Sequence, residues 1–566
     1  MLQTLLVSLL LAANPSTGVD TLVVCPDALR GALRPWIEYR QAQGHRIMVI
    51  APRSRADRLR DDIRQVARSG GLRFLVLVGD ARSDGTDRGR KLVTPTGSVT
   101  ARVNVLWGST PRIATDNVYA DLDDDGVPDL ASGRLPADRP AELSRMIAKT
   151  IAYERQQAFG PWRRRFHFVA GPGGFGPLAD KALEVAAKSL ITSSVPDAYR
   201  STMTYASWQS AYCPDPLRFR EMTARRLNEG SLFWIYIGHG HWRNLDMIRT
   251  GGIDRPILTT ADVGRLECPR GHPIAVFLCC YAGAFDAPDD CLAEEIVRQP
   301  GAPVAALAGT RVTMPYGMAV LGTEFLHSYF HDRPATLGET LLAAKQAMMA
   351  DRPGVGVTRQ RAAIDLLASA ISPAPEQLSA ERMEHVAMFH LFGDPLLRLR
   401  YPHPMSLDFP ATIGAGSRLT VSGDCDVDGR CSVELAVLPG RLPFRVPARG
   451  KVDLSTDARR AVQETYERAN EPRVSYAVCD VRQGRFQAEL TVPANARGQY
   501  LVRTFVAGKG AYGVGSGRIR VMPTDRADAT RRDVVIGTLP QSGRAAKGSS
   551  SRRHTAGLPS SENRSR

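Results

Sequence analysis

The chain has 566 residues and a formal net charge of +15, with 43% hydrophobic and 23% charged residues. These values are typical of globular proteins and exclude collagen, a coiled coil and a wholly disordered chain. The length indicates about three to four folding units, each large enough to bury its own core without disulfide support.

A short apolar run at residues 5–13 is followed at once by Pro15, Ser16 and Gly18. We expect residues 1–18 to be a secretory signal peptide, so that the protein is secreted or held in the bacterial cell envelope. A buried first helix is the alternative, but proline and glycine end the run early. The sequence has no apolar stretch of the about 20 residues that a membrane-spanning helix needs, so none is expected in the mature chain.

Residues 20–158 are predicted to form an N-terminal α/β subdomain. Its apolar runs are at 21–25, 46–52 and 73–80, and the amphipathic segments between them are at 33–44 and 56–70. Apolar strands separated by helices are typical of a parallel sheet covered on both faces. A long helix at 136–157, with Leu143, Ile147 and Ile151 on one face, is expected to connect this subdomain to the next.

The same alternation continues through residues 159–403, the predicted catalytic α/β subdomain. Its expected strands are at 166–171, 231–238, 273–280 and 302–309, and its expected helices are at 178–190, 218–230, 261–268 and 291–299. Helical segments between Met318 and Phe392 are expected to close the subdomain. This order of elements predicts an α/β fold on a parallel sheet.

From residue 405 to residue 522 the pattern changes to short runs of period two, separated by Gly, Pro and Asp. This pattern predicts an all-β sandwich, interrupted by one helical insertion at 455–470. Residues 524–566 are basic and rich in Ser, Gly and Arg, and we expect them to form a disordered tail. Because no aromatic residues are interleaved with its basic ones, we expect no nucleic-acid partner.

Nine cysteines leave at least one thiol outside any intrachain pairing. Cys425 and Cys431 bracket a short turn that one disulfide could close, which would be consistent with export. No Cys-x-x-Cys pair is present, so the sequence gives little support for a structural zinc site.

Two strand ends carry residues suited to catalysis. Gly238-His239-Gly240-His241 follows the run at 231–237, and Cys279-Cys280 closes the run at 273–280. Ligand sites in parallel sheets lie at the carboxyl ends of the strands, so a histidine and a cysteine are predicted to meet there. An imidazole that accepts a proton and a thiolate that attacks a carbonyl are the parts of thiol catalysis.

The backbone N–H groups of Gly240 and Cys280 are candidates for an oxyanion hole, because glycine allows close approach of the backbone to a substrate oxygen. Taken singly, His239 would be a core histidine and Cys280 a small core residue, and their shared strand-end position argues against that interpretation. Strand alternation turns one of Cys279 and Cys280 inward without deciding which. His241 is a second candidate base, which we interpret as a rim residue.

Five strings, at 115–137, 234–246, 277–286, 301–317 and 391–399, resemble the gingipain-type cysteine peptidases, relatives of the caspase fold. In that family the histidine lies in a Gly-His-Gly turn, which corresponds to His239. The nucleophile lies in a Cys-x-x-Gly pattern, which corresponds to Cys280 and resolves the choice against Cys279. The resemblance spans about residues 20–400 and implies a caspase/gingipain-like sheet in two subdomains, an immunoglobulin-like domain after it, and no organic cofactor.

The resemblance also implies an acidic residue upstream of the strand that contains Gly-Arg, where it orients the histidine. Asp129 occupies this place. The residues themselves give a competing interpretation, because several acids alternate around Gly126 at a spacing that can turn their carboxylates onto one calcium ion. These acids are Asp121, Asp123, Asp125 and Asp129. A plain exposed acidic loop is the third interpretation, and Asp129 cannot easily serve both of the first two roles.

Gingipains prefer Arg or Lys before the scissile bond, which requires an acidic pocket, and Glu142 is the candidate acid here. The expected function is therefore that of a secreted cysteine endopeptidase acting on proteins or peptides through a Cys280–His239 dyad and a thioester. Two alternatives remain open: a sortase-like processing peptidase of a secretion system, or a catalytically inactive secreted binding protein on this fold.

Overall fold

The computed structural model describes residues 18–81, 92–173, 193–350, 352–353 and 356–523. The expected signal peptide (apart from Gly18), the helix expected at 178–190 and the expected basic tail lie outside these residues. Among the described residues, no helix has the length and apolar character needed to span a membrane.

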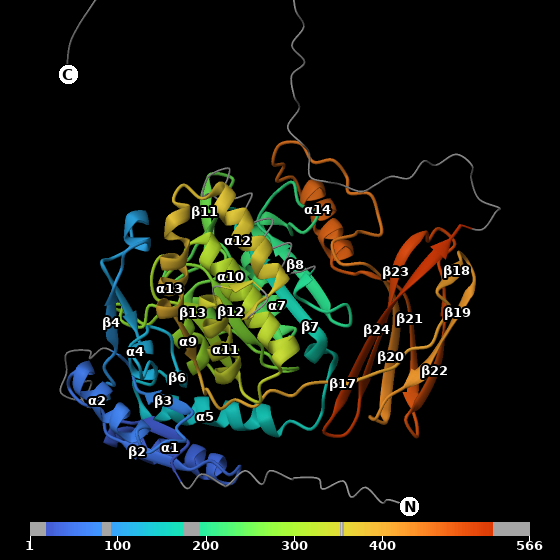
Figure 1. The fold of residues 1–566 in the computed structure, drawn as a ribbon. Coiled ribbons are helices and arrows are strands. Elements are labelled where there is room, and N and C mark those ends of the chain that lie inside the picture. The colour runs from blue at the N-terminus through green and yellow to red at the C-terminus, as the bar shows by residue number, and fades with distance from the viewer. Residues whose placement is uncertain (1–17, 82–91, 174–192, 351, 354–355, 524–566) are drawn as a thin grey trace, which may run out of the picture. The chain divides into compact units, whose positions relative to one another are not determined.

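A ten-stranded sheet forms the centre of residues 18–400 (Figure 1). Across the sheet the strands are β2 (Ile47–Ile50), β1 (Thr21–Val24), β3 (Phe74–Val78), β6 (Ala131–Leu135), β16 (Phe389–Phe392), β13 (Ala305–Gly309), β12 (Ile274–Leu278), β9 (Phe233–Ile237), β7 (Arg165–Ala170) and β8 (Arg200–Tyr205). This mostly parallel sheet confirms the predicted α/β class, and it crosses the boundary expected at residues 158/159, since both segments contribute strands.

The sheet consists of two parallel blocks that run in opposite directions. β16 pairs in parallel with β6 and antiparallel with β13, while β13, β12 and β9 are parallel to one another. The carboxyl ends of β9 and β12 therefore share an edge with the amino end of β6. The sequence predicted helices up to Phe392, and the short strand β16 at the end of that region was missed.

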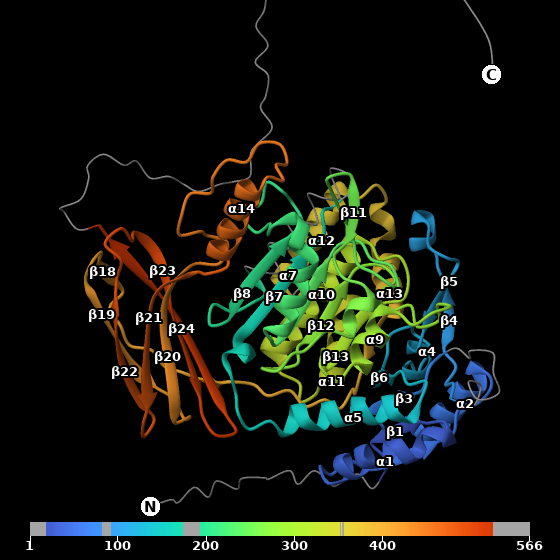
Figure 2. The same cartoon turned by 180° about the vertical axis from the view of Figure 1, so that it is seen from behind.

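Helices cover both faces of the sheet (Figures 1 and 2). One face packs against α1 (Asp27–Gln41), α5 (Pro140–Arg155), α7 (Phe219–Asn228), α8 (Thr260–Val263) and α9 (Leu292–Arg298). The other packs against α2 (Ala56–Ala67) and α4 (Asn117–Ala120) in one half, and in the other half against α10 (Pro315–His327), α11 (Leu337–Met349), α12 (Arg359–Ile371) and α13 (Leu378–Met388). Each strand thus contributes alternate side chains to two cores.

The remaining elements of this region are short. The 3-10 helices are η1 (Asn104–Trp107), η2 (Pro161–Arg164), η3 (Pro216–Arg218) and η5 (Pro375–Gln377), and η4 (Ser328–Asp332) is a π-helical turn. The two-stranded ribbons are β4 (Gly97–Thr100) with β5 (Arg112–Thr115), β10 (Met247–Thr250) with β11 (Ile253–Pro256), and β14 (Arg352–Pro353) with β15 (Gly356–Val357). The β10–β11 hairpin follows the histidine loop directly.

An all-β region follows the α/β region, as predicted. One sheet contains β17 (His403–Pro404), β24 (Tyr512–Met522), β23 (Gly498–Ala507), β20 (Gly429–Val437), β21 (Arg473–Val481) and β18 (Thr412–Gly414), and the other pairs β19 (Arg418–Asp424) with β22 (Arg485–Thr491). Apolar side chains of both sheets share one core, among them Leu419, Val433, Leu490 and Val502.

The insertion in this region contains α14 (Thr456–Ala469), which lies within the helix expected at 455–470. Asn470, which follows it, reaches the outer strand β8 of the ten-stranded sheet. Its side-chain Nδ2 donates to the Met203 carbonyl at 2.9 Å, and its Oδ1 accepts from the Met203 N–H at 2.7 Å. The amide thus pairs with Met203 at the free edge of β8 as another strand would, which blocks this position to a second chain.

The structure brings Cys431 opposite Cys479 rather than opposite Cys425. The two residues are direct partners in the antiparallel pair β20–β21, whereas the loop of Cys425 lies at the end of β19. All three thiols are free in this structure, so the Cys425–Cys431 bridge stays a prediction, and Cys479 is a second candidate partner for Cys431 because cross-strand neighbours have close Cβ atoms.

Candidate active site

The histidine loop and the cysteine loop leave neighbouring strands at the same level. β9 and β12 are parallel and pair Ile237 with Leu278, so His239 and Cys280 each lie two residues beyond a paired position. The loops touch at Gly240: a Cβ there would lie 2.6 Å from Cys279 Sγ and 2.6 Å from the Cys280 carbonyl oxygen. Glycine is therefore required between the two candidate catalytic residues.

Strand alternation separates the two adjacent cysteines. Cys279 is fully buried and joins the core between the sheet and α9, whereas Cys280 is partly exposed. Burial raises the pKa of the Cys279 thiol well above its usual value, and the nearby Cys280 raises it further. Cys280 is therefore the accessible thiol at this strand end.

Thr313 surrounds the sulfur of Cys280 with polar groups. Its backbone N–H donates to Cys280 Sγ at 3.3 Å, and its side-chain Oγ1 lies 3.6 Å from the same sulfur. Burial raises the pKa of the Cys280 thiol, and the hydrogen bonds from Thr313 oppose that rise. The thiol at rest thus needs a base before it can attack, while the Thr313 N–H is ready to stabilise a thiolate.

The chain turns sharply after Cys280, because Tyr281 has a positive φ of 56°. A non-glycine residue in this left-handed region is uncommon and carries backbone strain. The turn is held by two hydrogen bonds to the next strand end: Tyr281 N–H donates to the Arg311 carbonyl at 3.1 Å, and Gly283 N–H donates to the Gly309 carbonyl at 3.0 Å. This arrangement fixes the backbone on the carboxyl side of Cys280.

Asp246 lies beside the histidine loop. Its Oδ2 accepts a hydrogen bond from the backbone N–H of His239 at 3.3 Å, and its Oδ1 accepts one from Met247 N–H at 2.9 Å. The hydroxyl of Tyr236 donates to the His239 carbonyl at 2.8 Å and accepts from Asp246 N–H at 3.3 Å. Both backbone groups of His239 are therefore held by side chains.

No sequence motif indicated a role for Asp246, although it lies only seven residues after His239. A local sequence signal was available, because a carboxylate in the turn between a strand-end histidine and a hairpin can fold back on that histidine. Thr313 was also missed, because it acts on the sulfur through its backbone N–H, and every residue type except proline offers that group.

His241 takes the place expected of a rim residue. It is partly exposed, and its ring stacks on Trp242 with ring centroids 3.6 Å apart. Burial and the charge of Arg243 lower its pKa, so its neutral form is favoured.

Asp129 lies at the same edge of the sheet as His239 but far along it. It precedes β6, and β16, β13 and β12 separate β6 from β9. Four strand spacings correspond to about 19 Å. The Asp129 Oδ2 instead accepts a hydrogen bond from Leu122 N–H at 2.7 Å, within its own loop. The strand order therefore places Asp129 far from His239, which does not support the orienting role expected for Asp129.

Glu142 follows the carboxyl end of β6, which is the edge of the sheet where β9 and β12 begin. Its carboxylate accepts a hydrogen bond from Asp138 N–H at 2.9 Å, in the first turn of α5. Glu142 thus contacts the backbone at the start of α5. It is separated from Cys280 because β6 and β12 run in opposite directions, so their carboxyl ends lie at opposite edges of the sheet.

The acidic loop before β6 is folded around its own backbone. Carboxylate oxygens of Asp121, Asp123 and Asp129 lie within 4.8 Å of one another. Asp121 accepts from the N–H groups of Asp124 and Gly126 at 2.8 and 3.1 Å. Asp125, the fourth expected ligand, is outside this group, and its Oδ1 accepts from Val127 N–H at 2.7 Å.

Residues 14–400 match the family described as peptidase family C25. Lys-gingipain of Porphyromonas gingivalis is 23% identical over 296 residues, which cover 50% of this chain and 15% of that protein. Lys-gingipain W83 of the same species is 24% identical over 296 residues, with the same coverage. The chain thus spans a small part of the length of these relatives.

Among solved structures, the Arg-specific cysteine proteinase gingipain R is similar over 89% of this chain and 98% of that chain, with a TM-score of 0.50 and 18% sequence identity. At this identity the similarity establishes the fold, which extends from the ten-stranded sheet into the all-β region.

Proposed function

Since the chain belongs to peptidase family C25, we propose that it is a secreted cysteine endopeptidase that uses Cys280 as nucleophile and His239 as base. The observation that carries this proposal is the meeting of the two loops at Gly240, with His239 and Cys280 at equal positions beyond paired strand ends. Family membership supports protein or peptide substrates, and export rests on the apolar segment at residues 5–13.

The reaction begins when His239 accepts the proton of the Cys280 thiol and the sulfur bonds to the carbonyl carbon of the substrate. This order follows from the raised pKa of the thiol, which leaves it protonated at neutral pH. The backbone N–H groups of Gly240 and Cys280 are the proposed donors to the carbonyl oxygen as it becomes an oxyanion. The carbon–nitrogen bond then breaks, and the amine leaves with the proton from His239.

The second half of the reaction releases the acyl group. Water gives one proton to His239 and attacks the thioester, the carbon–sulfur bond breaks, and the sulfur of Cys280 regains its proton. The N–H of Thr313 stabilises the sulfur whenever it carries negative charge, at the start and at the end of the cycle.

Selective alkylation of Cys280 tests this function. Iodoacetamide at neutral pH is expected to label Cys280 before the other cysteines, and the His239→Ala substitution is expected to slow that labelling and to lower cleavage of a mixed peptide library by at least about 10³-fold. Mass spectrometry locates the label, and added amines reveal whether the acyl group is transferred or hydrolysed.

The matched control is Cys279→Ala, which removes the neighbouring buried thiol and should keep both the labelling of Cys280 and the cleavage. Cleavage that persists in Cys280→Ala would refute the proposed nucleophile. Labelling that is indifferent to His239, with no cleavage of any peptide, would favour a binding protein on a peptidase fold.

We also propose calcium as a structural ion of the acidic loop at 121–129. Hard carboxylate oxygens are the ligands that calcium prefers, and Asp121, Asp123 and Asp129 offer them close together. Arg60 and Arg64 pair with Asp124, an acid outside this group, at 2.6 and 2.9 Å, and Arg60 also lies 3.7 Å from Asp121 Oδ2 within it.

Calcium is expected to raise the Tm of the wild type, since a ligand that binds only the folded state stabilises it. Asp123→Asn should remove most of the increase, whereas Asp124→Asn, which changes an arginine-paired acid, should keep it. Differential scanning fluorimetry with calcium or a chelator measures both, and an unchanged Tm in the wild type argues for a plain acidic loop.

A further inference from the structure

Asp246 joins the histidine loop to the hairpin β10–β11 and is half-buried beneath it. Its carboxylate holds the backbone N–H of His239, and its own backbone N–H donates to the Tyr236 hydroxyl that also holds the His239 carbonyl. Asp246 therefore contacts His239 directly through its carboxylate and indirectly through the Tyr236 hydroxyl.

Gly171, directly after β7, makes room for this arrangement. A Cβ at Gly171 would lie 2.4 Å from Asp246 Oδ2 and 3.1 Å from the Tyr236 hydroxyl oxygen. The first contact is shorter than a real Cβ atom makes and the second is tight, so a side chain at position 171 would displace the carboxylate from the ends of β7 and β9. The position of the carboxylate is consequently fixed by packing as well as by hydrogen bonds.

Charge supports the same pairing. Burial raises the pKa of the Asp246 carboxyl, and the positive charge of protonated His239 opposes that rise. The other titratable groups that interact with this carboxylate are Tyr236 and Cys279, while Arg243 of the same loop acts on His241. A half-buried carboxylate is costly unless a cation compensates it, and the imidazolium of His239 is the cation that forms during the proposed reaction.

We propose that Asp246 is the positioning carboxylate of His239, which orients the ring toward Cys280 and stabilises the imidazolium formed when the thiol gives up its proton. This inference rests on the proposed cysteine peptidase activity. It assigns to Asp246 the role that the sequence resemblance implied for Asp129.

The experiment compares Asp246→Asn with the wild type in a pH profile of kcat/KM on a cleaved peptide. The variant keeps the shape of the side chain and removes its charge. We expect kcat to fall by about 10–100-fold with little change in KM, because the imidazolium loses its counter-charge. We also expect the acidic limb, where protonated His239 cannot accept the thiol proton, to move to lower pH by about one unit.

Two further substitutions separate this role from a purely structural one. Gly171→Ala leaves the charge in place but displaces the carboxylate, so it should lower kcat and move the acidic limb in the same direction. Asp254→Asn removes an exposed carboxylate of the same hairpin and should leave the profile unchanged. Gly264→Ala, at a glycine where a Cβ meets nothing within 4 Å, is the control for the added methyl group.

Thermal unfolding of each variant shows that it is folded, and if Asp246→Asn folds poorly, Gly171→Ala carries the same test. A wild-type kcat and an unmoved acidic limb in both variants would overturn the assignment of Asp246, provided that Cys280→Ala and His239→Ala are inactive. Activity that survives in Cys280→Ala would instead refute the peptidase proposal itself, so the two failures are distinguishable.

Discussion

Two histidines on neighbouring strands of the sheet illustrate how position along a strand decides what a histidine can do. His239 lies two residues beyond β9, is partly exposed and has the Asp246 carboxylate beside its backbone. His167 lies in the middle of β7, opposite Trp234 of β9, and is 1% exposed. The same side chain is thus available to a substrate in one region and enclosed in the other.

Positive charges predominate around His167, although the Glu229 carboxylate lies 3.8 Å from its Nε2. Arg165, Arg200 and Arg226 surround His167, whose Nδ1 is hydrogen-bonded to the hydroxyl of Thr202. Burial, and after it these arginines, lower the pKa of His167 well below its usual value. His167 therefore stays neutral even when the pH falls below the usual pKa of a histidine.

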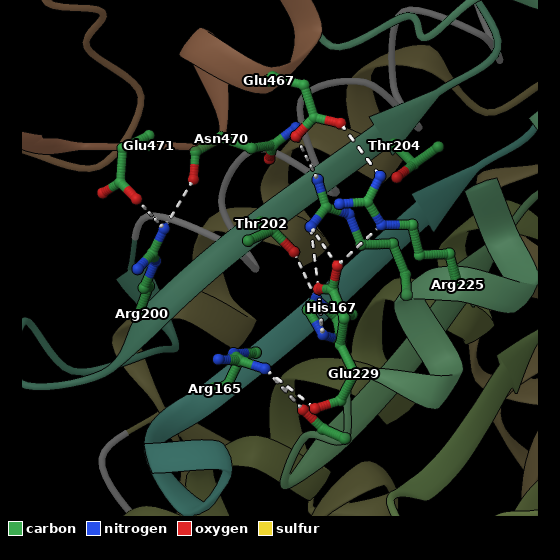
Figure 3. Close-up of polar contacts among 12 residues, drawn as sticks. Arg165, His167, Arg200, Thr202, Thr204, Arg225, Glu229, Glu467, Asn470 and Glu471 are labelled. Carbon is green, nitrogen blue, oxygen red and sulfur yellow. Dashed lines mark hydrogen bonds and ion pairs between the residues drawn. The ribbon is translucent and has the colours of Figure 1, made fainter. Parts of the chain in front are cut away.

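Two of these three arginines, Arg200 and Arg226, contact the region around α14, and Figure 3 shows Arg200 beside Glu471. Arg226 donates to the Tyr466 hydroxyl at 2.8 Å, and Arg200 pairs with Glu471 at 3.0 Å. Two of the arginines that help to keep His167 neutral thus serve a second purpose, since they bind the all-β region to β8 and α7.

Replacing each histidine is the most direct test of whether position along the strand decides its role. His167→Gln is expected to keep kcat/KM within about twofold, in contrast to the loss of at least about 10³-fold expected for His239→Ala. Steady-state cleavage of one peptide by both variants measures the difference. A loss of activity in folded His167→Gln comparable to that of His239→Ala would show that strand-end position is not the deciding factor.

The same His167→Gln variant also tests the comparison through the pH dependence of stability. Because the folded-state pKa of His167 lies below the unfolded value of about 6.5, the unfolded chain binds the extra proton first. The contribution of neutral His167 to stability is therefore complete above pH 6.5 and is lost as the pH falls below it. We expect Tm to decline less steeply below pH 6.5 in the variant than in the wild type.

A smaller effect is expected from Asn470→Ala. The substitution leaves the N–H and carbonyl of Met203 without their side-chain partner and should lower the free energy of unfolding by about 1–3 kcal/mol. Hydrogen exchange at Met203 should accelerate, while kcat/KM stays unchanged. Arg460→Ala, at an exposed residue of α14, is the control, and equal exchange at Met203 in both variants would argue against the edge contact.

Residue types and strand ends were enough to predict the position of His239 and Cys280, because both depend only on where apolar runs stop. Asp246 could not be predicted in this way. Its contact with His239 depends on the return of the chain through a hairpin and on the absence of a side chain at Gly171, two tertiary facts. Asp129 was favoured by resemblance, yet its distance from His239 follows from a strand order that the sequence does not reveal.

The fold could be predicted where the hydrophobic periodicity was strong. The prediction was incomplete where one short strand decides the topology. The apolar runs gave the parallel strands and the period-two runs gave the all-β region. The strand β16 is four residues long and follows α13 directly, so its apolar residues continue the helical pattern before it. The reversal of direction between the two blocks of the sheet depends on that strand alone.

The central position of β16 has a consequence for how the protein is made. This strand, at Phe389–Phe392, joins β6 of the first block to β13 of the second, although about 250 residues separate it from β6 along the chain. During synthesis the blocks cannot join until the ribosome has released residue 392. A nascent chain that stops earlier presents two unpaired strand edges, which are the surfaces that chaperones protect and that premature pairing would misassemble.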